Sequence, residues 1–135
     1  MIQEVHHIGI AVRSIEEALP RWRDGLGLEL IGTDDVPSEK VRVAMLRIGH
    51  TRIELLESTD PEGPVGRFLE KHGPGIHHIA LQTDGIENQV SSLRAQNVQV
   101  LGDGVRPGAH GTTVAFLHPK SFDGVLTEVV EESSS

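Results

Sequence analysis

The chain has 135 residues, enough for one compact domain with a hydrophobic core. Its 12 basic and 20 acidic side chains give a formal net charge of −8, which argues against non-specific binding to nucleic acids or anionic membranes but leaves an anionic substrate open. Cysteine is absent, which excludes disulfides, and 3% aromatic residues disfavour a base-stacking surface. No signal region or membrane-spanning apolar run is present, so we expect a cytoplasmic protein.

The first half of the chain predicts a strand, a helix and three further strands. Residues 5–12 alternate between apolar and other positions, as a half-buried strand does. Ser14 opens a capping box, and apolar residues then follow at helical spacing over Ile15–Leu26. Pro20 should kink this helix, and Gly27 should end it. The three strands are expected near residues 29–33, 41–48 and 52–57.

The second half predicts the same order of elements. A turn-rich linker over residues 58–75 contains a short predicted helix at 64–72, ended by Gly73. Asn97 should stop the helix of the second half. The chain is therefore expected to be a single domain, 1–135, with βαβββ modules at 1–57 and 76–132. In the second module, a strand at 77–83 and a helix at 86–96 precede strands near 98–101, 112–117 and 124–131.

A sequence repeat relates the two modules and carries polar residues with it. His7 aligns with His78 at one offset (78 − 7 = 71), and the same offset relates the hydrophobic positions of the predicted helices. After three extra residues in the second copy, Glu54 aligns with Glu128. Each module of about 60 residues therefore supplies one early histidine and one late glutamate. Two histidines and two glutamates are a ligand set that suits a divalent metal between the modules.

The neighbours of these residues favour a cavity. On its strand, His7 shares a face with the small residues Gly9 and Ala11, and His78 has small or polar neighbours as well. Both glutamates alternate with apolar residues, and a lone carboxylate there would be costly to bury. Taken singly, each residue reads as an ordinary strand-end histidine or exposed glutamate. Their recurrence at repeated positions argues against that interpretation.

The other histidines are assigned by position. His6 and His77 share the apolar faces of their strands, and we expect them to pack against the helices as supporting residues. His50 is expected in a turn and His72 at a helix end. His110 and His118 lie in predicted loops, which commonly carry binding residues.

Five segments resemble one family over nearly the whole chain. The duplicated βαβββ plan resembles the vicinal oxygen chelate superfamily, and the narrower motifs are similar to the methylmalonyl-CoA epimerase family within it. The matching segments are HHIGIAV (6–12), IELLE (53–57), FLEKHGPGIHHIAL (68–81), RPGAHGTTVAFLHPK (106–120) and GVLTEVVE (124–131).

The resemblance implies a fold and a ligand set. The fold is α+β, with two pseudo-symmetric βαβββ modules forming a curved, mostly antiparallel sheet around a metal site. The implied metal ligands are His7, Glu54, His78 and Glu128, where some members have Gln in place of Glu54. Some members also carry a further glutamate as catalytic base, and Val43 stands at that position here. A homodimer is implied as well.

The resemblance further implies R/S epimerisation of methylmalonyl-CoA, an acyl-CoA substrate. This reaction removes a proton next to a thioester and returns one to the other face, and a divalent cation stabilises the enolate oxygen. Glu54 and Glu128 are the expected catalytic bases. A mixed histidine and carboxylate set suits Co²⁺, Mn²⁺, Ni²⁺ or Zn²⁺ without choosing among them.

Two other functions stay open on the sequence. A glyoxalase I-type lactoylglutathione lyase also performs metal-assisted proton transfer, and a metal-free small-molecule-binding protein could share the fold. An extradiol dioxygenase is disfavoured, because Fe(II) sites of that kind use two histidines and one carboxylate and keep coordination positions open.

Overall fold

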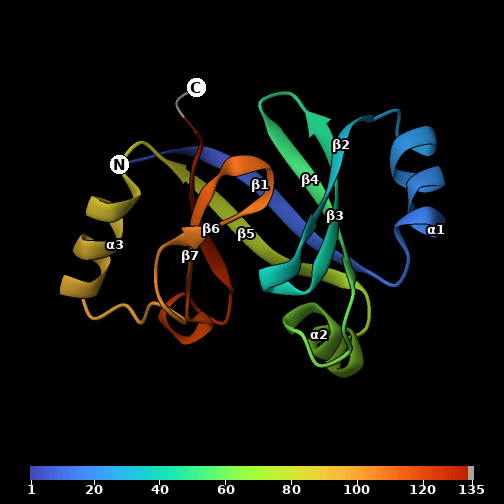
Figure 1. Cartoon of the computed structure of the whole chain (residues 1–135). Helices are drawn as coiled ribbons and strands as arrows, with labels where there is room; N and C mark the ends of the chain where they lie inside the picture. The colour runs from blue at the N-terminus through green and yellow to red at the C-terminus, as the bar shows by residue number, and fades with distance from the viewer. Residues whose placement is uncertain (134–135) are drawn as a thin grey trace. The chain divides into compact units, whose positions relative to one another are not determined.

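A computed structural model describes residues 1–133 and gives both modules the predicted order of elements (Figure 1). The first module comprises β1 (Ile2–Val12), α1 (Ile15–Leu19), the π-helix η1 (Pro20–Gly25), β2 (Glu29–Val36), β3 (Val41–Ile48) and β4 (Thr51–Ser58). After α2 (Pro64–His72), the second comprises β5 (Gly75–Thr83), α3 (Ile86–Ala95), β6 (Arg106–Pro107), β7 (Thr113–Leu117) and β8 (Thr127–Glu131). Three short 3₁₀ turns lie at Pro37–Glu39, Ala109–Gly111 and Pro119–Ser121. The predicted α+β class is thus confirmed.

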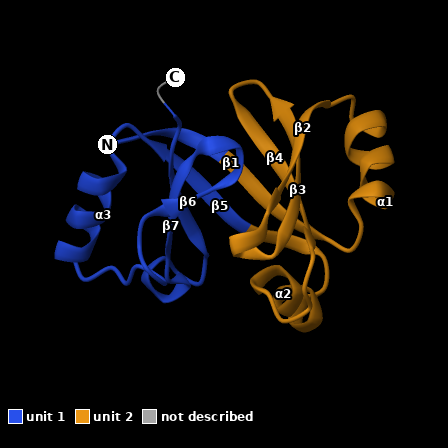
Figure 2. Ribbon diagram, viewed as in Figure 1, with its two compact units in different colours: residues 1–6, 78–135 blue, residues 7–77 orange. Residues whose placement is uncertain are grey.

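The chain forms two compact units, coloured separately in Figure 2. Unit 2 contains residues 7–77, and unit 1 contains residues 1–6 together with the C-terminal part from residue 78. The boundary therefore falls within β1 and within β5, between adjacent histidines in each strand.

Unit 2 has the strand order β2-β3-β4-β1. Strand β1 runs parallel to β4, and the β2–β3 and β3–β4 pairs are antiparallel. One face of these strands packs on α1, because Val12, Ala44, Leu46 and Leu55 form a buried cluster with Ile15. The predicted apolar face of the first strand is confirmed, since Ile8 and Ile10 pack against this cluster.

Unit 1 repeats the arrangement with the strand order β5-β8-β7-β6. Strand β5 runs parallel to β8, whereas β7 is antiparallel to both β8 and β6. Its helix-facing core joins Ile86 and Val90 of α3 to Ala115, Leu117 and Val129 of the strands. In each unit, apolar burial thus fixes which strand face meets the helix and leaves the other face for polar side chains.

The predicted helix from Ile15 to Leu26 changes type at Pro20. Ser14 caps it as expected, its Oγ accepting a hydrogen bond from the Glu17 N–H at 3.1 Å. The α-helix ends at Leu19 and continues as a π-helix from Pro20, because proline cannot donate the next helical hydrogen bond. The positive φ of Gly27 (75°) confirms the predicted stop, and Asn97 (66°) does the same after α3.

The strand predicted at 98–101 is wrong. Only an isolated bridge between Val100 and Leu117 forms there, and a short β6 over Arg106–Pro107 pairs with β7 instead. The apolar pattern was misleading because Val98 and Val100 pack on the α3 core without joining a ladder. The strand predicted at 124–131 begins only at Thr127, since Asp123 and Gly124 adopt positive φ values and turn the chain.

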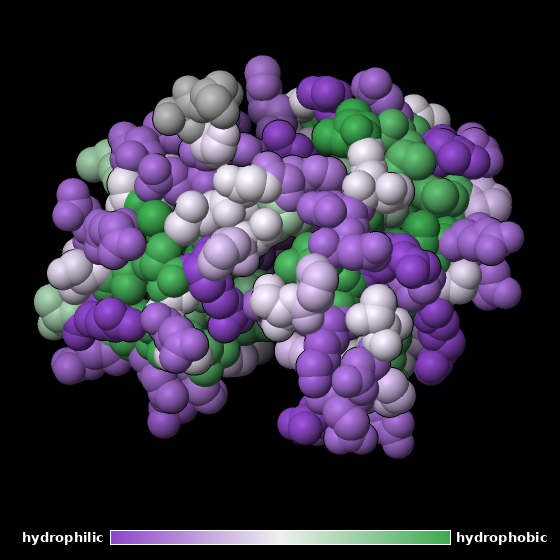
Figure 3. Space-filling view, viewed as in Figure 1, coloured by the Kyte–Doolittle hydropathy of each residue, from purple (hydrophilic) through white to green (hydrophobic). Residues whose placement is uncertain are grey.

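Polar side chains cover much of the face seen in Figure 3, with apolar side chains visible between them. Such scattered apolar exposure is ordinary for a folded surface. Among the described residues, none of the helices is both long enough and apolar enough to cross a membrane.

Candidate functional site

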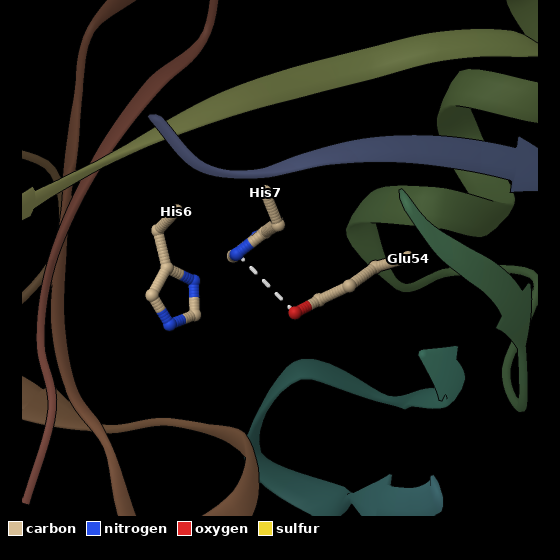
Figure 4. A group of neighbouring side chains, drawn as sticks. All are labelled: His6, His7 and Glu54. Carbon is tan, nitrogen blue, oxygen red and sulfur yellow. Dashed lines mark ion pairs between the residues drawn. The ribbon is translucent and has the colours of Figure 1, made fainter. Parts of the chain in front are cut away.

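In unit 2, His7 and Glu54 form a buried pair. Gly9, two residues after His7 on the same face of β1, lies opposite Glu54 in the parallel β1–β4 register. This register brings His7 Nδ1 to 3.2 Å from Glu54 Oε2 (Figure 4). Both residues are about 95% buried, with relative exposures of 4% and 5%. They lie on the face that the helix α1 does not cover.

In unit 1, His78 and Glu128 form the equivalent pair. Ala80 lies opposite Glu128 in the parallel β5–β8 register, and His78 precedes Ala80 on the same face. His78 Nε2 lies 3.0 Å from Glu128 Oε1, and each residue is 5% exposed. The structure therefore brings the four predicted residues together as two pairs, one in each unit.

Each pair can contribute one imidazole nitrogen and one carboxylate oxygen to a cation. Burying a carboxylate without a partner costs several kcal/mol, roughly, so four buried ionisable groups need a compensating interaction. The histidine supplies part of it within each unit. Imidazole and carboxylate together are a donor set that transition-metal dications accept, and the residues present therefore fit such an ion.

The layer next to each pair differs between the units. Met45 lies opposite Glu54 in the β3–β4 register, whereas Phe116 lies opposite Glu128 in the β7–β8 register. The ring of Phe116 packs perpendicular to that of His78, with centroids 5.8 Å apart and an interplanar angle of 80°. Sequence reasoning missed this aromatic contact, although the conserved offset places Phe116 at the position of Met45.

A second glutamate on each last strand has a structural role. Glu57 Oε1 accepts a hydrogen bond from the Ile15 N–H at 2.7 Å, and Glu131 Oε1 accepts one from the Ile86 N–H at 2.7 Å. A carboxylate at a helix N-terminus satisfies an otherwise unpaired donor and complements the helix dipole. These two glutamates repeat as Glu54 and Glu128 do, but the sequence pattern alone does not reveal their capping role.

His6 and His77 behave differently from each other. His77 packs edge-on against Phe68 of α2, with centroids 5.0 Å apart, which confirms the expected helix contact. His6 is 2% exposed and instead its Nε2 hydrogen-bonds with Glu132 Oε1. Glu132 was missed because it lies in an acidic run at the end of the last strand, where nothing in the pattern distinguishes it.

The other histidines lie where the sequence predicted. His50 is in the turn between β3 and β4, and His72 is the last residue of α2. His118 Nδ1 accepts a hydrogen bond from the Lys120 N–H at 3.0 Å, and His110 adopts a left-handed φ of 54° in the Gly108–Gly111 loop. The role of these two loop histidines in substrate contact stays a prediction.

Val43 stands at the position where the resemblance implies a further glutamate in some members of the family. It is 2% exposed and lies opposite Leu56 on β4, so an apolar contact occupies the place of the glutamate that some relatives carry. On this strand face Glu54 is a buried carboxylate, whereas Asp34, which lies opposite Val43 on β2, is only partly buried.

The fold and the repeated pairs define the class of protein. A sequence profile described as the Glyoxalase/Bleomycin resistance protein/Dioxygenase superfamily matches residues 6–116, and the chain belongs to this superfamily. This superfamily corresponds to the vicinal oxygen chelate group that the motifs resemble.

Its relatives narrow the class further. The chain is 39% identical over 131 residues to an ethylmalonyl-CoA/methylmalonyl-CoA epimerase of Cereibacter sphaeroides, covering 96% of this chain and 98% of the relative. It is 35% identical to the mitochondrial methylmalonyl-CoA epimerase of Homo sapiens, covering 93% and 72%. A solved methylmalonyl-CoA epimerase in complex with methylmalonyl-CoA and NH4+ is 36% identical, with a TM-score of 0.96 over 99% of this chain and 97% of that one. The chain thus belongs to the methylmalonyl-CoA epimerase family.

Proposed function

We propose that this protein is an epimerase that interconverts the R and S forms of methylmalonyl-CoA. The observation that carries the proposal is the duplicated, buried His–Glu pair on the strand face opposite the helix of each unit. Relatives of nearly equal length are named for the same activity, and a similar structure holds methylmalonyl-CoA. Family, fold and donor set therefore agree on one reaction.

The proposal includes one divalent cation held by His7, Glu54, His78 and Glu128. When bound, such a cation acts as a Lewis acid that stabilises negative charge on the substrate oxygens. The mixed donor set suits Co²⁺, Mn²⁺, Ni²⁺ or Zn²⁺. The support is chemical: each unit buries one nitrogen and one oxygen donor, and cation binding would replace two separate pairs by a shared partner.

The chain's own residues would carry the proton. The α-carbon of methylmalonyl-CoA lies between a thioester and a carboxylate, so its proton is acidic enough for a carboxylate base once the developing charge is stabilised. We assign removal and return of this proton to Glu54 and Glu128, one for each epimer. Each of these side chains is 5% exposed, which limits competition from bulk water.

The proposal extends to the oligomeric state and the cellular location of the enzyme. The family resemblance implies a homodimer, and a bacterial epimerase among the relatives supports a cytoplasmic location. Sedimentation-velocity measurement of the purified chain tests the dimer. A mass corresponding to one chain at micromolar concentration would contradict it.

Deuterium exchange at the α-carbon of methylmalonyl-CoA tests the activity. Purified protein loaded with Co²⁺ should exchange the α-proton with solvent and convert a single epimer into a mixture of both epimers. Metal-stripped protein should do neither. Methylglyoxal with glutathione is the control substrate and should give no product. Turnover of the control alone would replace the epimerase by a glyoxalase I-type lyase, and ligand binding without turnover would indicate a binding protein.

The same exchange reaction tests the assignment of two bases. If Glu54 and Glu128 act on opposite faces, each metal-loaded glutamine variant should lose epimerisation but keep exchange of one epimer. The residual exchange should favour opposite epimers in Glu54→Gln and Glu128→Gln. Exchange of the same epimer by both variants, or of neither, would contradict the paired assignment and leave the metal ligands unaffected.

A further inference from the structure

Within unit 1, an arginine lies close to the His78–Glu128 pair. The guanidinium carbon of Arg106 lies 5.1 Å from the centroid of the Phe116 ring, a distance typical of cation–π contacts. Phe116 in turn meets His78 at 5.8 Å in a perpendicular arrangement, and His78 contacts Glu128 at 3.0 Å. Four side chains from β6, β7, β5 and β8 thus form one continuous series of contacts.

The guanidinium lies between the Phe116 ring and the backbone of a turn. Arg106 lies opposite Val114 in the β6–β7 pair, which places it at the edge of the sheet beside Phe116. A Cβ built on Gly102 would come within 2.9 Å of Arg106 Nη1, so the backbone of the 101–104 turn passes directly against the guanidinium. Gly102 also has a φ of +58°, which an alanine would adopt only with strain. The turn therefore lies against one side of this guanidinium.

We infer that Arg106 is a positioning residue for His78, acting through Phe116. The inference rests on the proposed function, in which His78 binds the metal. The imidazole χ2 angle is intrinsically soft, so a histidine without lateral contacts samples a broad range of ring orientations. Phe116 restricts that range from the side, and the cation–π contact with Arg106 restricts Phe116. Groups that orient metal-ligating histidines commonly change metal affinity by about 10- to 100-fold.

Unit 2 offers a natural contrast. Asp34 lies opposite Val43 there, as Arg106 lies opposite Val114, and Met45 occupies the position of Phe116. A flexible thioether and a carboxylate cannot form the same cation–π contact. The contact of an arginine with an aromatic ring therefore occurs beside His78 in unit 1 and is not repeated in unit 2.

The test uses the purified full-length protein and Co²⁺ as the probe. Arg106→Met should lower Co²⁺ affinity about tenfold, measured by calorimetric titration, and should shift the visible d–d absorption of the bound ion. Arg106→Lys, which keeps the charge but replaces the guanidinium by an ammonium group, should fall between Arg106→Met and the parent protein. In the Phe116→Leu background, Arg106→Met should have no additional effect, because the intermediary is gone.

Arg94 provides the matched control. Its guanidinium lies against the same turn, since a Cβ on Gly104 would come within 2.9 Å of Arg94 Nη2, but it belongs to α3. Arg94→Met should leave Co²⁺ affinity and the absorption spectrum unchanged. Equal losses in the two arginine variants would overturn the inference, because they would reveal a general effect on the turn.

The outcomes separate the inference from the proposed function. If the parent protein binds Co²⁺ and Arg106→Met matches it in affinity and spectrum, the inference alone is overturned. If Arg106→Met does not fold, Arg106→Lys carries the test, and parental affinity and spectrum in that variant overturn the inference. If the parent protein binds no Co²⁺, the metal site of the proposed function fails and the inference falls with it.

Discussion

In unit 2, Met45 lies opposite Glu54, whereas in unit 1 Phe116 lies opposite Glu128. The parallel pairing of first and last strand is the same in both units, and so is the buried His–Glu pair. Duplication has therefore preserved the backbone register that makes the pair, while the residues behind it have diverged. The strand register positions the donor residues, and the residue opposite each glutamate differs between the units.

The edge strands of the two units also differ. Strand β2 spans eight residues, Glu29–Val36, but its counterpart β6 spans only two, Arg106–Pro107. In unit 1, the residues on either side of this short strand form the 101–104 turn and the Gly108–Gly111 loop. Gly108 is required there, because a Cβ on it would lie 2.6 Å from Val114 Cγ1. Unit 1 therefore has more irregular backbone around its edge strand than unit 2.

Removing one histidine at a time tests whether the two pairs are equivalent. We expect His7→Ala and His78→Ala each to lose bound metal, measured by elemental analysis, and to lose at least about 10³-fold in turnover, because a Lewis-acid contribution of several kcal/mol disappears. His6→Ala, which removes the hydrogen bond with Glu132, should keep part of both. Unchanged metal content in both ligand variants would contradict the shared site.

The sequence was sufficient for the repeated parts of this comparison. Period-two alternation located β1 and β5, and the offset between copies aligned Glu54 with Glu128. These features depend on local pattern, which one sequence contains. The predicted helix start at Ser14 and the stops at Gly27 and Asn97 are confirmed for the same reason: each depends on the chemistry of one or two residues.

The sequence was insufficient where long-range packing decides. The apolar residues near Val98 predict a strand, but burial against α3 satisfies them without a ladder. The capping role of Glu57 and Glu131 depends on which strand end meets which helix, and the contact of Arg106 with Phe116 depends on a two-residue strand. The capping glutamates lie 42 and 45 residues from their partners, and no local period reveals any of these contacts.

Neutralising one carboxylate at a time separates ligand from base. Glu54→Gln should keep the metal, because the amide oxygen can still ligate, but should lose about 10²-fold or more in turnover, the scale for removing a general base. Glu128→Gln should lose turnover and also bind metal less tightly, since a neutral ligand donates less charge. The exposed Glu16→Gln is the control and should match the parent protein. Near-normal turnover of metal-loaded Glu54→Gln would make Glu54 a ligand only.

Truncating equivalent core leucines asks whether the two units unfold together. Leu46 and Leu117 occupy the same repeat position (117 − 46 = 71), and their exposures are 0% and 1%. Each change to alanine should lower the free energy of unfolding by about 2–5 kcal/mol, measured in urea. A single shared transition in both variants indicates one cooperative domain, whereas two transitions, with only one of them shifted in each variant, would indicate independent units. Ile48→Ala, at a side chain 41% exposed, should have a small effect.

The smallest expected effect concerns the carboxylates that cap the helices. Glu57→Ala and Glu131→Ala should each lower the free energy of unfolding by about 1 kcal/mol, because each removes the acceptor of a helix N-terminal N–H. The glutamine variants should lose less, since an amide oxygen still accepts but no longer carries charge. Glu57 also meets Arg42, with Oε2 and Nη1 3.5 Å apart, yet such a surface pair contributes little, so the two alanine variants should agree within a few tenths of a kcal/mol, roughly. Equal losses of unfolding free energy would show that both units retain the capping role of these glutamates. A loss confined to one unit would show that divergence between the units extends beyond the layer behind the histidines.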